Sequence, residues 1–232
     1  MKLAVFDLDH TLLPIDSGDA WSHWLVEKAG LDREILAERI EGYAESYRQG
    51  NFVPLDFIHF QFSLLAAEKR SDLDAWRAEF IDRIIRPAIR PEALALLMER
   101  RRAGYELLLA TGTHRFVTEP IAELFGIRWL AAATPEERPD GSFTGEIVGS
   151  DSYGEGKLLL VREWIEKLEL QYGKTTSLEA WSDSINDLPL LEFAAGFEPA
   201  GRAVAANADP KLREAARRHG WEQVELFDKK KE

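Results

Sequence analysis

The spacing of apolar residues predicts one buried strand at the start of the chain and a run of helices after it. Residues 3–6 form a short, continuous apolar segment, which is typical of a strand buried in a parallel sheet. From Asp16 to about Ile85, apolar residues recur every three or four positions, as they do along one face of a helix. The spacing gives four stripes: Trp21, Trp24 and Leu25; Leu36, Ile40, Tyr43 and Tyr47; Phe57, Phe60 and Leu64; and Leu73, Trp76, Phe80 and Ile84.

After Pro91 the pattern changes to an alternation of strands and helices, which predicts an α/β fold. The expected strands are 105–110, 127–130, 178–182, 203–206 and 221–226, and the expected helices are 91–103, one that ends at 125, 156–168, 188–195 and 210–219. Residues 138–142 are typical of a hairpin turn. Such alternation indicates a Rossmann-like, doubly wound parallel sheet with helices on both faces. We expect residues 1–15 and 88–232 to form this discontinuous core and residues 16–87 to form an inserted α-helical cap domain.

The composition narrows the classes of protein that the chain can represent. Lys and Arg number 29 against 41 Asp and Glu, a net charge of −12, which disfavours a nucleic-acid partner. The absence of cysteine excludes disulfides, thiolate metal sites and a cysteine nucleophile. Because Asp7 interrupts the first apolar run and no other run approaches a membrane span, we expect a cytoplasmic globular protein without membrane contact. The composition gives no sign of a protein partner.

Two carboxylates follow the first predicted strand. Asp7 and Asp9 stand at positions i and i+2, which places both side chains on the same side of an extended chain. Unpaired carboxylates at the mouth of a buried strand are costly, so the two residues need a cation or a chemical role. The alternative is an ordinary acidic loop with a capping aspartate, and the pair alone does not decide between the two.

Polar residues also follow two other predicted strands. Thr111 and Gly112 follow one of them, where a hydroxyl and exposed backbone amides suit a phosphate oxygen. Asp183 and Asp187 follow the other, and carboxylate oxygens are the ligands that hard divalent cations prefer. Helix capping is the alternative for the threonine and for one of the two acids.

A lysine completes the set of candidate residues. Lys157 opens a predicted helix, where the helix dipole disfavours a cation, so it is a candidate functional residue; the alternative is a solvated surface lysine. Ligands of an open parallel sheet bind beyond the carboxyl ends of the strands, where Asp7, Asp9, Thr111 and Asp183 should meet. Four ionised carboxylates would give −4 against +3 from one Mg²⁺ and the lysine. A proton on Asp9 would balance the site, and this is the state that a general acid needs.

These four segments, in this order, resemble the haloacid dehalogenase superfamily of phosphohydrolases, and the resemblance covers residues 3 to about 227. The helical insert and residues 182–191 are similar to the phosphoserine-phosphatase-like branch, near its bacterial histidinol-phosphatase-like members. Residues 7–11 match the first motif, Thr111 the second, Lys157 the third, and Asp183 with Asp187 the fourth.

The resemblance implies a Mg²⁺-dependent phosphomonoesterase that acts on a small phosphorylated metabolite. Asp7 would be the nucleophile that forms an aspartyl phosphate, and Asp9 would protonate the leaving oxygen and then activate water. The Mg²⁺ set would comprise Asp7, Asp9 through its backbone carbonyl, Asp183 and Asp187 in support. Phosphate and substrate contacts would come from Thr111, Gly112, Lys157 and Asn186.

The substrate depends on residues outside these motifs. Phosphoserine phosphatases carry an acid nine positions after the nucleophile that binds the substrate amine, and Asp16 holds that position here. The resemblance thus implies phosphoserine or histidinol phosphate, while the alternative role of Asp16 is to cap the first helix of the insert. We expect His114 and Arg115 to face solvent rather than substrate. We expect the insert aromatics Trp21, Trp24, Phe57 and Phe60 to form core rather than a substrate wall.

Two other functions are compatible with the same motifs. A phosphotransferase or phosphomutase would pass the phosphoryl group to an organic hydroxyl instead of water. A receiver-like signalling module would keep the phosphoryl group on Asp7 for a partner to recognise. Asp9 argues against the receiver because a second acid accelerates loss of the phosphoryl group, and a helical insert that excludes water has no purpose there.

Overall fold

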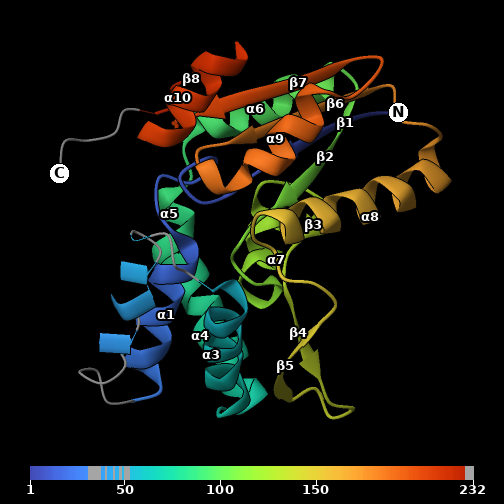
Figure 1. Ribbon diagram of the computed structural model, residues 1–232. Coiled ribbons are helices and arrows are strands. Elements are labelled where there is room, and N and C mark those ends of the chain that lie inside the picture. Colours follow the sequence, from blue (N-terminus) through green and yellow to red (C-terminus); the bar gives the residue numbers. More distant parts are fainter. Residues whose placement is uncertain (31–37, 40, 44, 47–48, 50–52, 228–232) are drawn as a thin grey trace.

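The computed structural model describes the chain except for residues 31–37, 40, 44, 47–48, 50–52 and 228–232. Its centre is a six-stranded sheet in which every neighbouring pair is parallel (Figure 1). In spatial order the strands are β3 (Trp129–Ala131), β2 (Tyr105–Ala110), β1 (Lys2–Phe6), β6 (Ser177–Ser182), β7 (Gly201–Ala206) and β8 (Glu222–Val224). The first strand of the chain therefore lies in the middle of the sheet, between β2 and β6.

Helices cover both faces of the sheet, which confirms the predicted α/β class. The side chains of Leu3 and Val5 pack on one face with α8 (Glu155–Tyr172), α9 (Leu188–Ala195) and α10 (Pro210–His219). The side chains of Ala4 and Phe6 pack on the other face with α6 (Pro91–Arg102) and α7 (Arg115–Leu124). Because successive side chains of a strand point to opposite faces, both faces of β1 are buried, and an uninterrupted apolar run results. None of the described helices combines the length and apolar character that crossing a membrane requires.

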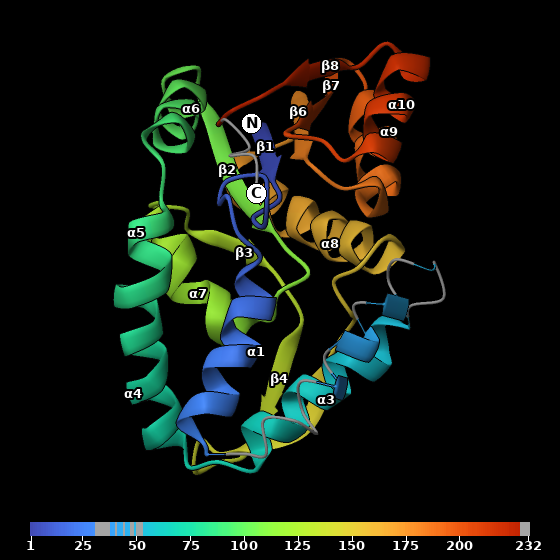
Figure 2. The same cartoon turned by 90° about the vertical axis from the view of Figure 1, so that its left-hand side faces the viewer.

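A helical insert follows β1 and projects beyond the carboxyl edge of the sheet (Figures 1 and 2). Its described helices are α1 (Ser17–Lys28), α3 (Pro54–Ala66), α4 (Arg70–Phe80), a π-helical turn (Ile81–Ile85) and α5 (Arg86–Ala88). The first, third and fourth apolar stripes lie on α1, on α3, and on α4 with the π turn. In the second stripe, Leu36, Ile40 and Tyr47 lie outside the described residues.

The aromatic residues of the insert pack against one another and against the core. Trp21 is buried, and its ring meets those of Phe80 and Phe116 edge-on, with centroids 5.4 and 5.9 Å away. Trp24 donates its indole N–H to the backbone carbonyl of Trp76 at 3.0 Å. These contacts place the α1 aromatics in packed interior, as expected. Phe60 is also buried, and Phe57 is half-buried beside it.

A β-hairpin from the second half of the chain packs against the insert. Its strands are β4 (Thr134–Glu137) and β5 (Phe143–Val148), joined by the expected turn. Arg70 of α4 donates to the backbone carbonyl of Gly141 at 2.9 Å and pairs with Glu137 at 3.1 Å. The hairpin lies within residues that the sequence pattern assigned to the core, but its contacts join it to the insert. The pattern could not show this, because a hairpin turn carries no information about which surface it covers.

Candidate active site

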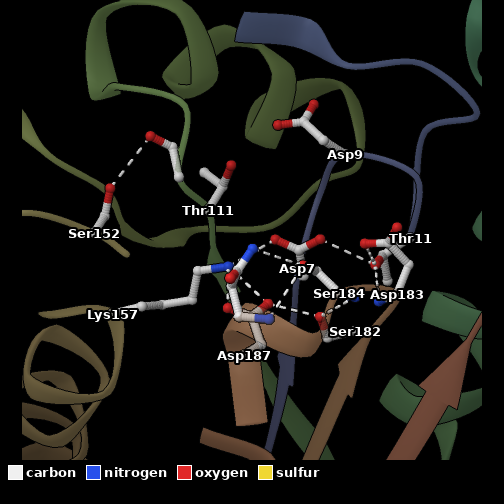
Figure 3. Close-up of polar contacts among 12 residues, drawn as sticks. Asp7, Asp9, Thr11, Thr111, Ser152, Lys157, Ser182, Asp183, Ser184 and Asp187 are labelled. Carbon is white, nitrogen blue, oxygen red and sulfur yellow. Dashed lines mark hydrogen bonds and ion pairs between the residues drawn. The ribbon is translucent and has the colours of Figure 1, made fainter. Parts of the chain in front are cut away.

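The predicted site residues gather at the carboxyl edge of the three central strands (Figure 3). Asp7 follows β1, Thr111 follows β2, and Asp183 follows β6. Since β1 pairs with both neighbours in parallel register, the ends of all three strands lie side by side. The convergence inferred from the strand pattern is therefore present in the structure.

Lys157 forms the centre of this cluster. Its Nζ lies 2.9 Å from Asp7 Oδ1 and 2.7 Å from Asp187 Oδ1, and its side chain is only 6% exposed. Burial opposes the charge on the lysine, but attraction to Asp187 and Asp7 outweighs burial and raises its pKa above the usual value. The lysine stands in the first turn of α8, after Gly154, whose φ of +49° favours glycine. The placement excludes the solvated surface lysine that was the alternative.

Thr11 joins the two central strands, although the sequence pattern gave it no role of its own. Its hydroxyl donates to Asp7 Oδ2 at 3.0 Å and accepts from the backbone N–H of Asp183 at 2.9 Å. The same hydroxyl oxygen lies 3.5 Å from Asp183 Oδ1. Asp7 and Asp183 therefore approach one hydroxyl from two sides. Its place inside the first motif, four residues after the nucleophile candidate Asp7, was the signal available from the sequence.

The electrostatics of Asp7 and Asp183 favour a bound cation. Burial, then repulsion from Asp7 and Asp187, raises the pKa of Asp183 to about 9. Burial also raises the pKa of Asp7, although Lys157 lowers it. A divalent cation between the two carboxylates would stabilise both in the ionised form, and carboxylate oxygens suit Mg²⁺.

Side chains alone do not supply a full set of metal ligands among the described residues. Within the described part of the chain, no three Asp, Glu or His side chains form a group that could hold a metal ion. Asp187 is committed elsewhere, since it pairs with Lys157 and accepts from the Ser182 hydroxyl at 2.6 Å. The residues present therefore fit a cation held by Asp7 and Asp183 with backbone and water oxygens, with Asp187 in support.

Asp9 points away from Asp7, towards the helical insert (Figure 3). Its Oδ1 accepts from the backbone N–H of Ser17 at 2.7 Å, and its Oδ2 accepts from the Thr113 hydroxyl at 2.9 Å. Burial, repulsion from Asp16 and repulsion from Asp7 raise the pKa of Asp9 to about 7. The raised pKa favours the protonated form of Asp9, which is the direction expected from the balance of charges.

Thr111 and Gly112 line the edge next to Asp7. Thr111 is fully buried, and its hydroxyl accepts from the backbone N–H of Thr113 at 3.1 Å. The N-cap of α7 is His114, so Thr111 does not cap that helix. A Cβ on Gly112 would lie 3.0 Å from the Tyr153 ring, so a side chain at this position would require that ring to shift.

Asp16 and Asn186 stand at the periphery of the cluster. Asp16 caps α1, because its carboxylate accepts from the backbone N–H of Asp19 at 2.8 Å. The capping role considered for Asp16 is therefore real, while its negative charge also acts on Asp9. Asn186 donates from its side chain to the Ser184 hydroxyl at 3.1 Å.

The expectation that His114 faces solvent is wrong, and Arg115 faces solvent only in part. His114 is 1% exposed, and its ring lies between Phe62 of the insert, at 5.5 Å, and Phe116, at 6.5 Å. Neither ring nitrogen has a hydrogen-bond partner among the described residues, and burial lowers the pKa of His114 to about 3. Arg115 is half-buried and donates to the Leu130 carbonyl at 2.7 Å. The sequence hid this because the insert covers His114 from a distant part of the chain.

Known proteins are similar to this chain in sequence and in fold. The haloacid dehalogenase-like hydrolase family matches residues 4–192. A Neisseria meningitidis protein named histidinol-phosphatase is 34% identical over 224 residues, which cover 95% of this chain and 96% of the relative. A Mycobacterium tuberculosis protein named phosphoserine phosphatase is 36% identical, over 94% of this chain and 69% of the relative.

Two solved structures are similar to this one over nearly the whole chain. A Bordetella pertussis protein of unknown function superposes with a TM-score of 0.87 at 38% identity, over 97% of this chain and 99% of that one. A substrate-bound phosphoserine phosphatase gives a TM-score of 0.64 at 21% identity, over 97% and 93%. The similarity to the phosphoserine phosphatase structure shows that the two chains share a fold.

We expect His114→Leu to reduce the loss of stability in acid. An unfolded histidine titrates near its ordinary pKa of 6.5, and burial lowers that of His114 to about 3, so between these values the unfolded chain binds more protons. The free energy of unfolding should therefore fall by up to about 1.4 kcal/mol per pH unit as the pH decreases through this window. Urea denaturation across the window should give a shallower slope for the variant. His59→Leu, at a half-exposed site, is the control, and parallel slopes for His114→Leu and wild type would contradict this account.

Proposed function

The chain belongs to the haloacid dehalogenase-like hydrolase family and is a phosphatase, and from that premise we propose that it hydrolyses phosphomonoesters through an aspartyl phosphate on Asp7, with Mg²⁺. The observation that carries the proposal is the buried Lys157 ammonium in contact with both Asp7 and Asp187. A lysine held there meets the phosphoryl oxygens of any group transferred to Asp7. Positioning and neutralisation of charge are most of what phosphoryl transfer requires.

The residues that would hold Mg²⁺ are Asp7, Asp183 and the backbone carbonyl of Asp9. When bound, the cation neutralises charge on the phosphoryl oxygens and lowers the pKa of the carboxylates that it touches. Asp187 supports this arrangement through its bonds to Lys157 and Ser182. Thr111 and the amides near Gly112 supply further donors for the phosphoryl group at the end of β2.

Two steps follow from these positions. In the first, a carboxylate oxygen of Asp7 attacks phosphorus, the bond from phosphorus to the ester oxygen breaks, and Asp9 gives that oxygen its proton. In the second, water attacks the phosphorus of phospho-Asp7, Asp9 takes the water proton, and the bond from phosphorus to Asp7 breaks. The products are an alcohol and inorganic phosphate, and both aspartates regain their starting states.

The substrate that we propose is a small, amine-bearing phosphate ester. The relatives named histidinol-phosphatase and phosphoserine phosphatase support this class, and the similarity to the first spans almost the whole of both chains. Asp16 contributes a negative charge beside Asp9, on the side where the leaving group would lie. A carboxylate there would attract an ammonium group of the substrate while it caps α1.

We expect release of phosphate from p-nitrophenyl phosphate to require Mg²⁺ and Asp7. Asp7→Asn should lower kcat by at least about a thousandfold, because an amide cannot form the acyl phosphate. EDTA should abolish turnover by the wild type, and added Mg²⁺ should restore it. Asp72→Asn, at an exposed position in the first turn of α4, is the matched control and should keep wild-type activity. Turnover that survives both EDTA and Asp7→Asn would contradict the proposal.

Asp16→Asn should separate recognition of an amine from capping. Asparagine caps helices as well as aspartate does, so the variant keeps α1 but loses the charge. KM for histidinol phosphate or phosphoserine should rise about tenfold, the effect of one charged hydrogen bond, while KM for p-nitrophenyl phosphate stays the same. Asp19→Asn, in the same turn, is the control. Equal changes for both kinds of ester would remove the amine-binding role of Asp16.

A further inference from the structure

The two oxygens of Asp9 have different partners from different parts of the chain. Oδ1 accepts from the backbone N–H of Ser17, the first residue of α1 in the insert, at 2.7 Å. Oδ2 accepts from the hydroxyl of Thr113, in the loop between β2 and α7, at 2.9 Å. These bonds fix Asp9 between the core and the insert, with its carboxyl turned away from Asp7 (Figure 3).

The Thr113 hydroxyl is itself held firmly. The residue is 5% exposed, and its backbone N–H donates to the hydroxyl of Thr111 at 3.1 Å. The first turn of α1 reaches it because Gly18 has no side chain: a Cβ there would lie 2.7 Å from Thr113 Oγ1. The hydroxyl of Ser17, the residue before Gly18, is fully buried and lies 3.4 Å from Thr113 Oγ1.

The chemistry of these partners assigns the Asp9 proton to one oxygen. A backbone N–H only donates, so Oδ1 remains an acceptor whether Asp9 is ionised or protonated, and the proton belongs on Oδ2. A hydroxyl both donates and accepts, so Thr113 suits Oδ2 in either state. It donates to the carboxylate; when Oδ2 carries the proton, Thr113 accepts and turns its own hydrogen towards the Ser17 hydroxyl.

We propose that Thr113 is the positioning residue for the acid–base function of Asp9, an inference that rests on the proposed function. Until the leaving oxygen is in place, the Thr113 hydroxyl accepts a hydrogen bond from the Oδ2 proton of Asp9, and the leaving oxygen takes over that hydrogen bond when the proton is transferred. The Thr113 hydroxyl donates to the Asp9 carboxylate once the proton has passed to the leaving oxygen and the alcohol has departed. When Asp9 takes a proton from the attacking water, the hydroxyl turns back. A purely apolar neighbour could serve neither state.

Hydrolysis of two aryl phosphates by Thr113→Val tests this inference. A poor leaving group needs protonation by Asp9, whereas p-nitrophenolate leaves without it, so kcat/KM should become more sensitive to the leaving group. We expect kcat/KM for phenyl phosphate to fall about 10- to 100-fold, and that for p-nitrophenyl phosphate to fall less than about threefold. Thr113→Ser should restore the phenyl phosphate value, because serine keeps the hydroxyl.

The matched control is Thr118→Val, a buried threonine of α7 whose hydroxyl donates to the backbone carbonyl of His114, the N-cap of that helix, at 3.2 Å. It should leave the ratio of the two kcat/KM values unchanged. If Thr113→Val does not fold, as judged by circular dichroism, Thr113→Ala against Thr113→Ser provides the same comparison.

The outcomes separate this inference from the proposed function. Equal losses on both esters, or no loss on either, would overturn the role of Thr113 while leaving the phosphatase intact. Failure of Thr113→Ser to restore phenyl phosphate turnover would also overturn it. A wild-type protein that hydrolyses neither ester would instead overturn the proposed phosphomonoesterase, and the role of Thr113 would fall with it.

Discussion

The buried Lys157 ammonium and its two carboxylate partners are the interaction on which the rest of the site depends. A charge taken out of water is stable only when it is paired, and Asp7 and Asp187 both lie within hydrogen-bond distance of Nζ. The pairing requires α8 to begin at the carboxyl edge of the sheet, where β1 and β6 end side by side. Removal of the lysine would leave two buried carboxylates facing each other, so the contact that we propose for the phosphoryl group also maintains the fold around it.

A second constraint couples the helical insert to the chemistry. The N-terminus of α1 touches Asp9 through the Ser17 amide and touches Thr113 at the glycine of its first turn. The insert therefore helps to orient Asp9, the residue that we propose as acid and base. Its far side is held by Arg70, which joins α4 to the β4–β5 hairpin. Residues from both halves of the chain thus determine how the insert sits over the sheet.

The sequence predicted what local pattern and strand order decide. The central strand, the turn of the hairpin, and the convergence of Asp7, Thr111 and Asp183 follow from periodicity and from the geometry of parallel sheets. Lys157 was identified because it breaks a helix rule. The roles of Thr11 and Thr113 were not, because their hydroxyls act only through contacts between strands and between core and insert. His114 was misplaced for the same reason: Phe62, which covers it, is more than fifty residues away in the sequence.

The central claim is that Asp7 carries the phosphoryl group during the reaction, and trapping that species tests it most directly. The protein would be mixed with phenyl phosphate that carries a radioactive label in its phosphoryl group. The mixture would then be quenched in acid, digested, and its labelled peptides identified by mass spectrometry. We predict label in the wild type on the peptide that contains Asp7, and none in Asp7→Asn. Label on another residue, or turnover of the ester without any labelled peptide, would contradict the account.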